Sequence, residues 1–315
     1  MSAFYNRPAR HVCLKILAVA LLGMSCHKGD DHIAHTSPIG FKAGVEETRA
    51  VVTDVEPLKE EGFSVWGGYG GTTVFDGRKV YWGQYPNGSL GWTYDNLETW
   101  TSNTYNFYAV YPAATNATYT VPNTFAIYNH DTGVHQEDLL IATACNHAYP
   151  DNGETVNLQF SHALTAVSFS IRLEDTGKPV GNTYRITSAT IGNVYTGGDI
   201  TIDNAGQLHV GPTGSQGGRY TFTDFEGSSF TTTTPMVSAP MITMPQETTA
   251  SLHIEIDVNG TTIEIDKADF AISWAPGVRY NYNLKITAHR EISVNVTTTQ
   301  WDKPNIGDII IGSTK

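Results

Sequence analysis

The sequence predicts an all-β protein, and three observations support this class. Charged residues make up only 16% of the 315 residues, whereas glycine and tyrosine are abundant. No apolar pattern with the helical period persists along the chain, and short alternating apolar runs recur between turn residues instead. These strand and turn signals fall into two sets, which predicts two β-sandwiches joined near residues 159–163.

Residues 1–26 have the features of a signal segment. Three basic residues precede an apolar run over residues 16–22, which is too short to span a bilayer. The sequence Gly-Met-Ser-Cys at 23–26 resembles a bacterial lipobox, so we predict that Cys26 is lipidated. Two acyl chains are enough to hold a protein stably on a membrane surface.

Residues 27–49 are predicted to form a propeptide that carries one removable strand. Apolar residues alternate with small or charged ones over residues 39–46, which is typical of a strand with one buried face. A polar, extended segment follows, in which the bond between Arg49 and Ala50 is accessible to a protease. The side chains predicted to fill an apolar groove are those of Ile39, Phe41, Ala43 and Val45.

Residues 50–160 contain the first set of strand signals. The glycine-rich run at 67–71 is not a phosphate-binding loop, because no helix follows it. The sequence Asp-Gly-Arg-Lys at 76–79 predicts a hairpin turn between two short apolar runs. Clean alternation at 156–160 predicts a strand with one buried face.

Residues 161–315 contain the second set. An alternating run covers residues 167–173, and the strongest hairpin signal is Asn259-Gly260 between two alternating strands. This dipeptide supplies the positive φ angles that a two-residue turn requires. The tail at 306–312 is unusually apolar for a chain terminus.

Charge and cysteine content exclude several classes of protein. Residues 50–315 carry 13 basic and 27 acidic residues, a net charge of −14, which nucleic acid would repel. Cys13 and Cys26 belong to the signal segment, so only Cys145 remains and no internal disulfide can form. The histidines of residues 27–35 lack supporting metal ligands, and we predict neither a metal nor a cofactor.

Catalysis is disfavoured by the same sequence. Ser161 and His162 are adjacent in a predicted strand, so their side chains point to opposite faces and cannot form a direct pair. The other histidines near Cys145 show no metal or triad spacing on a defined scaffold. We therefore predict that the protein is not an enzyme.

Several segments, in this order and spacing, resemble a Bacteroidales fimbrillin, a FimA/Mfa-like pilin of the type V pilus. They are Cys26, Thr48-Arg49-Ala50, residues 63–66, 107–112, 160–167 and 274–280, and Trp301. The resemblance implies two tandem transthyretin-like β-sandwich domains, over residues 50–160 and 161–315. It also implies export to the outer membrane as a lipoprotein, cleavage after Arg49 by a trypsin-like surface protease, and a final place in the extracellular fimbrium.

The resemblance further implies that other pilin subunits are the partners. Loss of the N-terminal strand would open a groove, and a C-terminal segment of a neighbouring subunit would fill it. The alternative for the apolar tail is a closing strand of the second sandwich, which would better fit a tip or accessory subunit. The residues of the candidate donor strand are Ile306, Ile309, Ile310 and Ile311.

A second functional hypothesis is adhesion to a glycan or protein receptor. Exposed aromatic rings stack on sugars, although most aromatic residues of sandwiches lie in the core. Trp92 and Trp100 occupy a turn-rich segment, which makes them the candidate surface aromatics for such a ligand.

Overall fold

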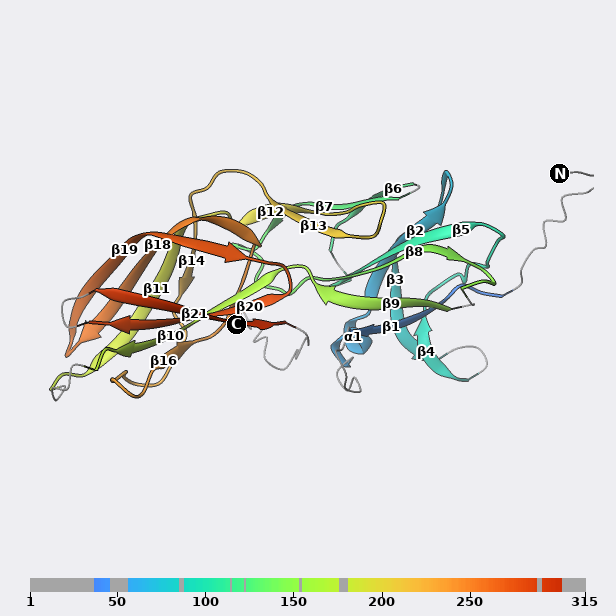
Figure 1. Ribbon diagram of the computed structural model, residues 1–315. Helices are drawn as coiled ribbons and strands as arrows, with labels where there is room; N and C mark the ends of the chain where they lie inside the picture. Colours follow the sequence, from blue (N-terminus) through green and yellow to red (C-terminus); the bar gives the residue numbers. More distant parts are fainter. Residues whose placement is uncertain are drawn as a thin grey trace, which may run out of the picture. The chain divides into compact units, whose positions relative to one another are not determined.

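The computed structural model describes residues 37–45, 56–84, 88–113, 115–121, 123–152, 155–175, 181–287 and 291–301. All of these residues lie in the unit Ala34–Lys315. Within them, one short helix, α1 (Glu56–Glu61), accompanies 21 strands (Figure 1). The prediction of an all-β protein is therefore confirmed.

Seven strands form a closed barrel in the order β1-β4-β3-β2-β5-β8-β9. Their bounds are β1 (Gly40–Val45), β2 (Phe63–Tyr69), β3 (Thr72–Gln84), β4 (Leu90–Thr93), β5 (Thr104–Tyr111), β8 (Leu140–Ala148) and β9 (Thr155–His162). Aromatic and aliphatic residues between Ile39 and Phe160 fill its interior. Strand β9 alternates strictly between exposed and buried residues, as the sequence predicts.

Two further sheets face each other across a second core, which draws on residues between Val167 and Ile286. One contains β10 (Thr165–Leu173), β15 (Phe225–Glu226), β16 (Met236–Ser238), β17 (Met241–Thr243), β20 (Val278–Ile286) and β21 (Ile292–Gln300). The other contains β11 (Tyr184–Val194), β14 (Gly218–Phe222), β18 (Gln246–Val258) and β19 (Thr261–Trp274). Both sheets supply residues to this core, which is the arrangement of a β-sandwich.

A fourth sheet joins strands from both sides of the predicted boundary at residues 160 and 161. It contains β6 (Thr118–Thr120), β7 (Thr124–Asp131), β12 (Gly197–Ile202) and β13 (Leu208–Pro212), and β7 pairs with β12. A third core cluster likewise combines early residues such as Trp66 with late ones such as Trp301. The division into domains at residue 160 stays a prediction.

The predicted hairpin turn at residues 76–79 is wrong. Strand β3 runs through this segment without interruption, and Gly77 takes a positive φ of 65° inside it. Its pairing with β2 shifts register twice nearby, so Asp-Gly here marks an irregularity within one strand. A true two-residue turn lies between β18 and β19, where Asn259 and Gly260 have φ angles of 51° and 84°.

We expect Gly260→Ala to lower the free energy of unfolding by about 1 kcal/mol, because a Cβ atom disfavours the left-handed conformation. Gly211→Ala in β13 is the control, since a Cβ atom there meets open space and no positive φ is required. Urea unfolding of both variants measures the difference. Equal midpoints for the two variants would contradict the assigned turn.

Candidate functional site

Strand β1 closes the barrel by lying between β4 and β9 (Figure 1). It runs parallel to β9, with a continuous register from Gly40 opposite Thr155 to Val45 opposite Phe160. On its other side it is antiparallel to β4, where Phe41 lies opposite Trp92. A strand drawn from the N-terminal segment therefore completes the ring of hydrogen-bonded strands.

The segment before β1 is fixed by hydrogen bonds to the residues that follow β4. The Ile39 amide donates to the carbonyl oxygen of Glu98 at 2.8 Å, and the Trp100 amide donates to that of Ser37 at 3.1 Å. The Tyr94 hydroxyl donates to the Ile39 carbonyl oxygen at 2.8 Å. These bonds hold the start of β1 in one register.

The inward side chains of β1, and that of Ile39 directly before it, are part of the barrel core. Ile39 is 1% exposed and Phe41 is 4% exposed. The Phe41 ring lies 5.4 Å from the ring of Phe75 and 5.8 Å from that of Phe107, both nearly edge-on. Ala43 is half-buried against the same core, and the neighbouring Lys42 is exposed.

An apolar trough thus lies beneath β1, and the aromatic residues of β3, β4 and β5 line it. Burying a side chain the size of Ile39 or Phe41 contributes about 1.5–3 kcal/mol. Removing β1 would expose these apolar surfaces together with the unpaired backbone groups of β4 and β9.

The prediction that Trp92 and Trp100 are surface aromatics is wrong. Trp92 is 5% exposed and packs edge-on against Phe63 with ring centres 4.9 Å apart. Trp100 is 1% exposed and its ring stacks on that of His147 at 5.0 Å. Both rings lie in the barrel core, beside the point where β1 closes the barrel.

Among the described residues of this region, the exposed aromatics are instead Tyr81 and Trp82 of β3, each 37% exposed. Trp82 lies opposite Trp92 across the β3–β4 pair, and the Lys59 ammonium of α1 sits 5.0 Å from the centre of its ring. The Tyr81 hydroxyl contacts the Asp95 carboxylate at 3.0 Å, and this hydrogen bond is the main cause that raises the pKa of Tyr81.

Sequence reasoning did not single out one buried polar cluster, which lies where β9 leads into β10. The His162 Nδ1 atom is 2.7 Å from Asp138 Oδ2, and both side chains are almost fully buried. The ring of Trp301 stacks on that of His162 with centres 4.1 Å apart. The nearest sequence signal was the adjacency of Ser161 and His162 in a predicted strand, which carries no information about Asp138.

Other predicted site residues lie outside the described residues. They are Cys26, Arg49, Ala50, Ile306, Ile309, Ile310 and Ile311, together with the side chain of Val45. Among the residues that the structure describes, no group of three or more potential ligands could hold a metal ion. The described helix is too short and too polar to cross a membrane.

Solved structures of low sequence identity share this fold. A fimbrial protein from Bacteroides vulgatus superposes with a TM-score of 0.58 at 15% identity, covering 84% of this chain and 99% of that one. A candidate cell adhesion protein from Bacteroides ovatus gives a TM-score of 0.52 at 16% identity, covering 84% and 97%. One from Bacteroides uniformis gives 0.51 at 17% identity with the same coverage.

The comparison with curated proteins gave no match. The comparison with protein families matches residues 48–301 to the fimbrillin-like family, which accounts for most of the chain. The match begins at the residue before Arg49 and ends at the buried Trp301. The chain therefore belongs to the fimbrillin-like family, the proteins of surface fimbriae, as the order of its sequence segments predicts.

Proposed function

We propose that this protein is a structural pilus subunit that polymerises by exchanging strand β1 for a strand of a neighbouring copy. It is exported as a lipoprotein attached through Cys26, and a trypsin-like surface protease cleaves it between Arg49 and Ala50. The observation that carries this proposal is the position of β1, which completes the barrel although its chain continues directly into the predicted cleavage site.

The register of β1 sets the requirements for an incoming strand. Such a strand must run parallel to β9 and antiparallel to β4, and it must offer apolar side chains at every second position. The tail residues Ile309 and Ile311 have this spacing. Strand addition of this kind gains affinity from main-chain hydrogen bonds and specificity from the pockets for alternate side chains.

The covalent attachment of β1 before cleavage serves a protective role in this proposal. An open edge between β4 and β9 would be a template for uncontrolled pairing during export. Placing β1 in the gap leaves no such edge until the protease acts. The lipid on Cys26 keeps the protein at the outer membrane up to that point, and cleavage releases it into the extracellular fimbrium.

The alternative role, a tip or accessory adhesin, would not require a C-terminal donor strand. It loses its sequence-based ligand residues, because Trp92 and Trp100 are buried. The two roles differ in one measurable property, since only a stalk subunit polymerises with itself.

Limited digestion of the full chain with trypsin tests the proposal. We expect a new N-terminus at Ala50, release of the β1 peptide, and ladders of oligomers that resist SDS. Arg49→Gln should abolish both the cut and the ladder, whereas Arg172→Gln, at an exposed arginine of β10, should leave both unchanged.

A second variant separates cleavage from assembly. The double substitution Ile309→Asp and Ile311→Asp should still be cut after Arg49 but should give no ladder. Ladders from this variant would refute the tail as donor, and cleavage of the parent chain without any oligomers would refute polymerisation by strand exchange.

A further inference from the structure

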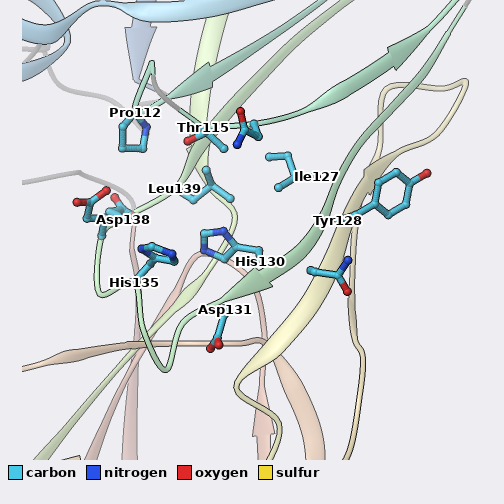
Figure 2. A pocket seen from close by; sticks show the side chains of 12 residues that line it. Pro112, Thr115, Ile127, Tyr128, His130, Asp131, His135, Asp138 and Leu139 are labelled. Carbon is cyan, nitrogen blue, oxygen red and sulfur yellow. The ribbon is translucent and has the colours of Figure 1, made fainter.

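A pocket of about 440 Å³ lies at the end of β7 (Figure 2), but its unpaired polar atoms are out of a ligand's reach. Among the described lining residues these atoms are Oδ1 of Asp138 and Nε2 of His130, and both are buried beneath the pocket surface. Accessible backbone groups without a strand partner lie instead at the edges of the open sheets, where a partner can pair with them.

Strand β21 forms one of these edges and is open along its whole length. Among the described residues it pairs only with β20, in a continuous register from Ile286 opposite Ile292 to Val278 opposite Gln300. Its nine residues include no charged residue and no proline, and the pairing contains no bulge. Charges, prolines and bulges are what soluble proteins use to prevent an edge from pairing, so β21 is a template for another strand.

The other edges of the open sheets have such protection. Strand β19, at an edge of the second sheet of the same sandwich, contains Glu264, Asp266, Lys267 and Asp269, and a register shift interrupts its pairing with β18. The other described edges, which are β6, β13, β14 and β15, are at most five residues long. This contrast within one molecule indicates that the β21 edge is available to a partner.

The side chains of β21 indicate which partner fits. Val296 lies opposite the buried Tyr282, on the core-facing side of the sheet, yet it is 40% exposed. Residues 293, 295, 297 and 299 form the outward row, which is exposed and entirely polar. Val296 is also the midpoint of the strand. In an antiparallel pair of two β21 strands centred there, the two Val296 side chains meet, and Asn295 of each copy lies opposite Thr297 of the other.

We propose that β21 binds β21 of a second copy of this chain, edge to edge and antiparallel, about a two-fold axis through Val296. The contact is isologous, and it brings together no charged side chains of β21, although each chain carries a net charge of −12. The apolar tail at 306–312 matches this edge less well, because its consecutive isoleucines at 309–311 would place apolar side chains on both faces.

The consequence for a pilus rests on the function proposed above. In a fibre built by exchange of β1, the β21 contact would join subunits of neighbouring fibres side by side. Many such contacts along two fibres would act together, so a weak contact between single subunits is sufficient.

Sedimentation velocity of the full Arg49→Gln chain tests the contact, because this variant is not cleaved and strand exchange cannot contribute. We expect a reversible dimer with a dissociation constant on the order of 10–100 µM, since one strand pair buries less than the roughly 1,200–2,000 Å² of a stable interface. In this background, Val296→Lys and Val296→Glu should each weaken the dimer at least ten-fold, because like charges then face each other across the axis. Thr262→Lys, at an exposed position of β19, is the control and should leave the dimer unchanged.

An equimolar mixture of Val296→Lys and Val296→Glu should dimerise again, at least as tightly as the parent, because opposite charges then meet. Such recovery requires that residue 296 faces its own copy, and misfolding of either variant could not produce it. The proposal is overturned if the parent stays monomeric, if either single variant dimerises as tightly as the parent, if the mixture fails to associate, or if Thr262→Lys disrupts the dimer. None of these results bears on strand exchange, which uses β1.

Discussion

Phe41→Ala should lower the unfolding free energy of the uncleaved chain by about 3–5 kcal/mol, the usual range for a buried aromatic truncated to alanine. Phe41 is 4% exposed and its ring contacts those of Phe75, Tyr94 and Phe107. Truncation leaves a cavity lined by these rings, which the barrel cannot collapse to fill because the strands on either side are fixed by their ladders. Denaturant unfolding of the uncleaved chain measures the loss.

The position of Phe41 upstream of the cleavage site makes this experiment more discriminating. Lys42→Ala is the matched control, because Lys42 is an exposed neighbour on the same strand and its loss should cost little. After cleavage and removal of the β1 peptide, the Phe41→Ala and parent proteins are chemically identical, so their stabilities should coincide. A loss below about 1 kcal/mol in the uncleaved chain would show that β1 does not belong to the core.

The local parts of this architecture could be predicted from sequence. The alternation of Val156, Leu158 and Phe160 gave strand β9 and its buried face, because a period of two depends only on neighbouring residues. The turn at Asn259-Gly260 could be predicted for the same reason, since its φ angles are a property of the dipeptide. The alternation around Phe41 likewise indicated which residues of β1 face inward.

Pairing between distant segments could not be predicted. Residues 40–45 pair in parallel with residues 155–160, and nothing in either segment specifies the other. The burial of Trp92 follows from the second pairing of β1, with β4, in which Trp92 lies opposite Phe41. Local turn signals therefore suggested a surface position that the closed barrel overrides. The Asp-Gly pair at 76–77 misled in the same way, because β3 pairs with β2 on both sides of it and continues through it as one strand.

Trp301→Ala should also cost about 3–5 kcal/mol, although Trp301 follows an edge strand whose residues are mostly exposed. Its side chain is 3% exposed, and its amide donates to the Gly277 carbonyl oxygen at 2.7 Å. One face of the ring stacks on His162, and the Arg279 guanidinium lies 5.2 Å from the ring centre. Gln300→Ala, at the exposed preceding residue, is the control and should change stability by less than about 0.5 kcal/mol.

The expected loss of unfolding free energy in Trp301→Ala would also show that Trp301 anchors the end of β21 to a core shared by early and late segments. Trp301 belongs to a core cluster that includes Trp66 and Tyr108 from the barrel strands and Leu164 and Ile242 from later segments. Removing the ring also uncovers the buried pair of Asp138 and His162, which is tolerated in the interior only while it is shielded and paired. Chemical unfolding followed by tryptophan fluorescence and by circular dichroism measures the change. A variant as stable as Gln300→Ala would mean that the chain after β21 is not anchored by Trp301, and the proposed donor tail would then have no fixed starting point.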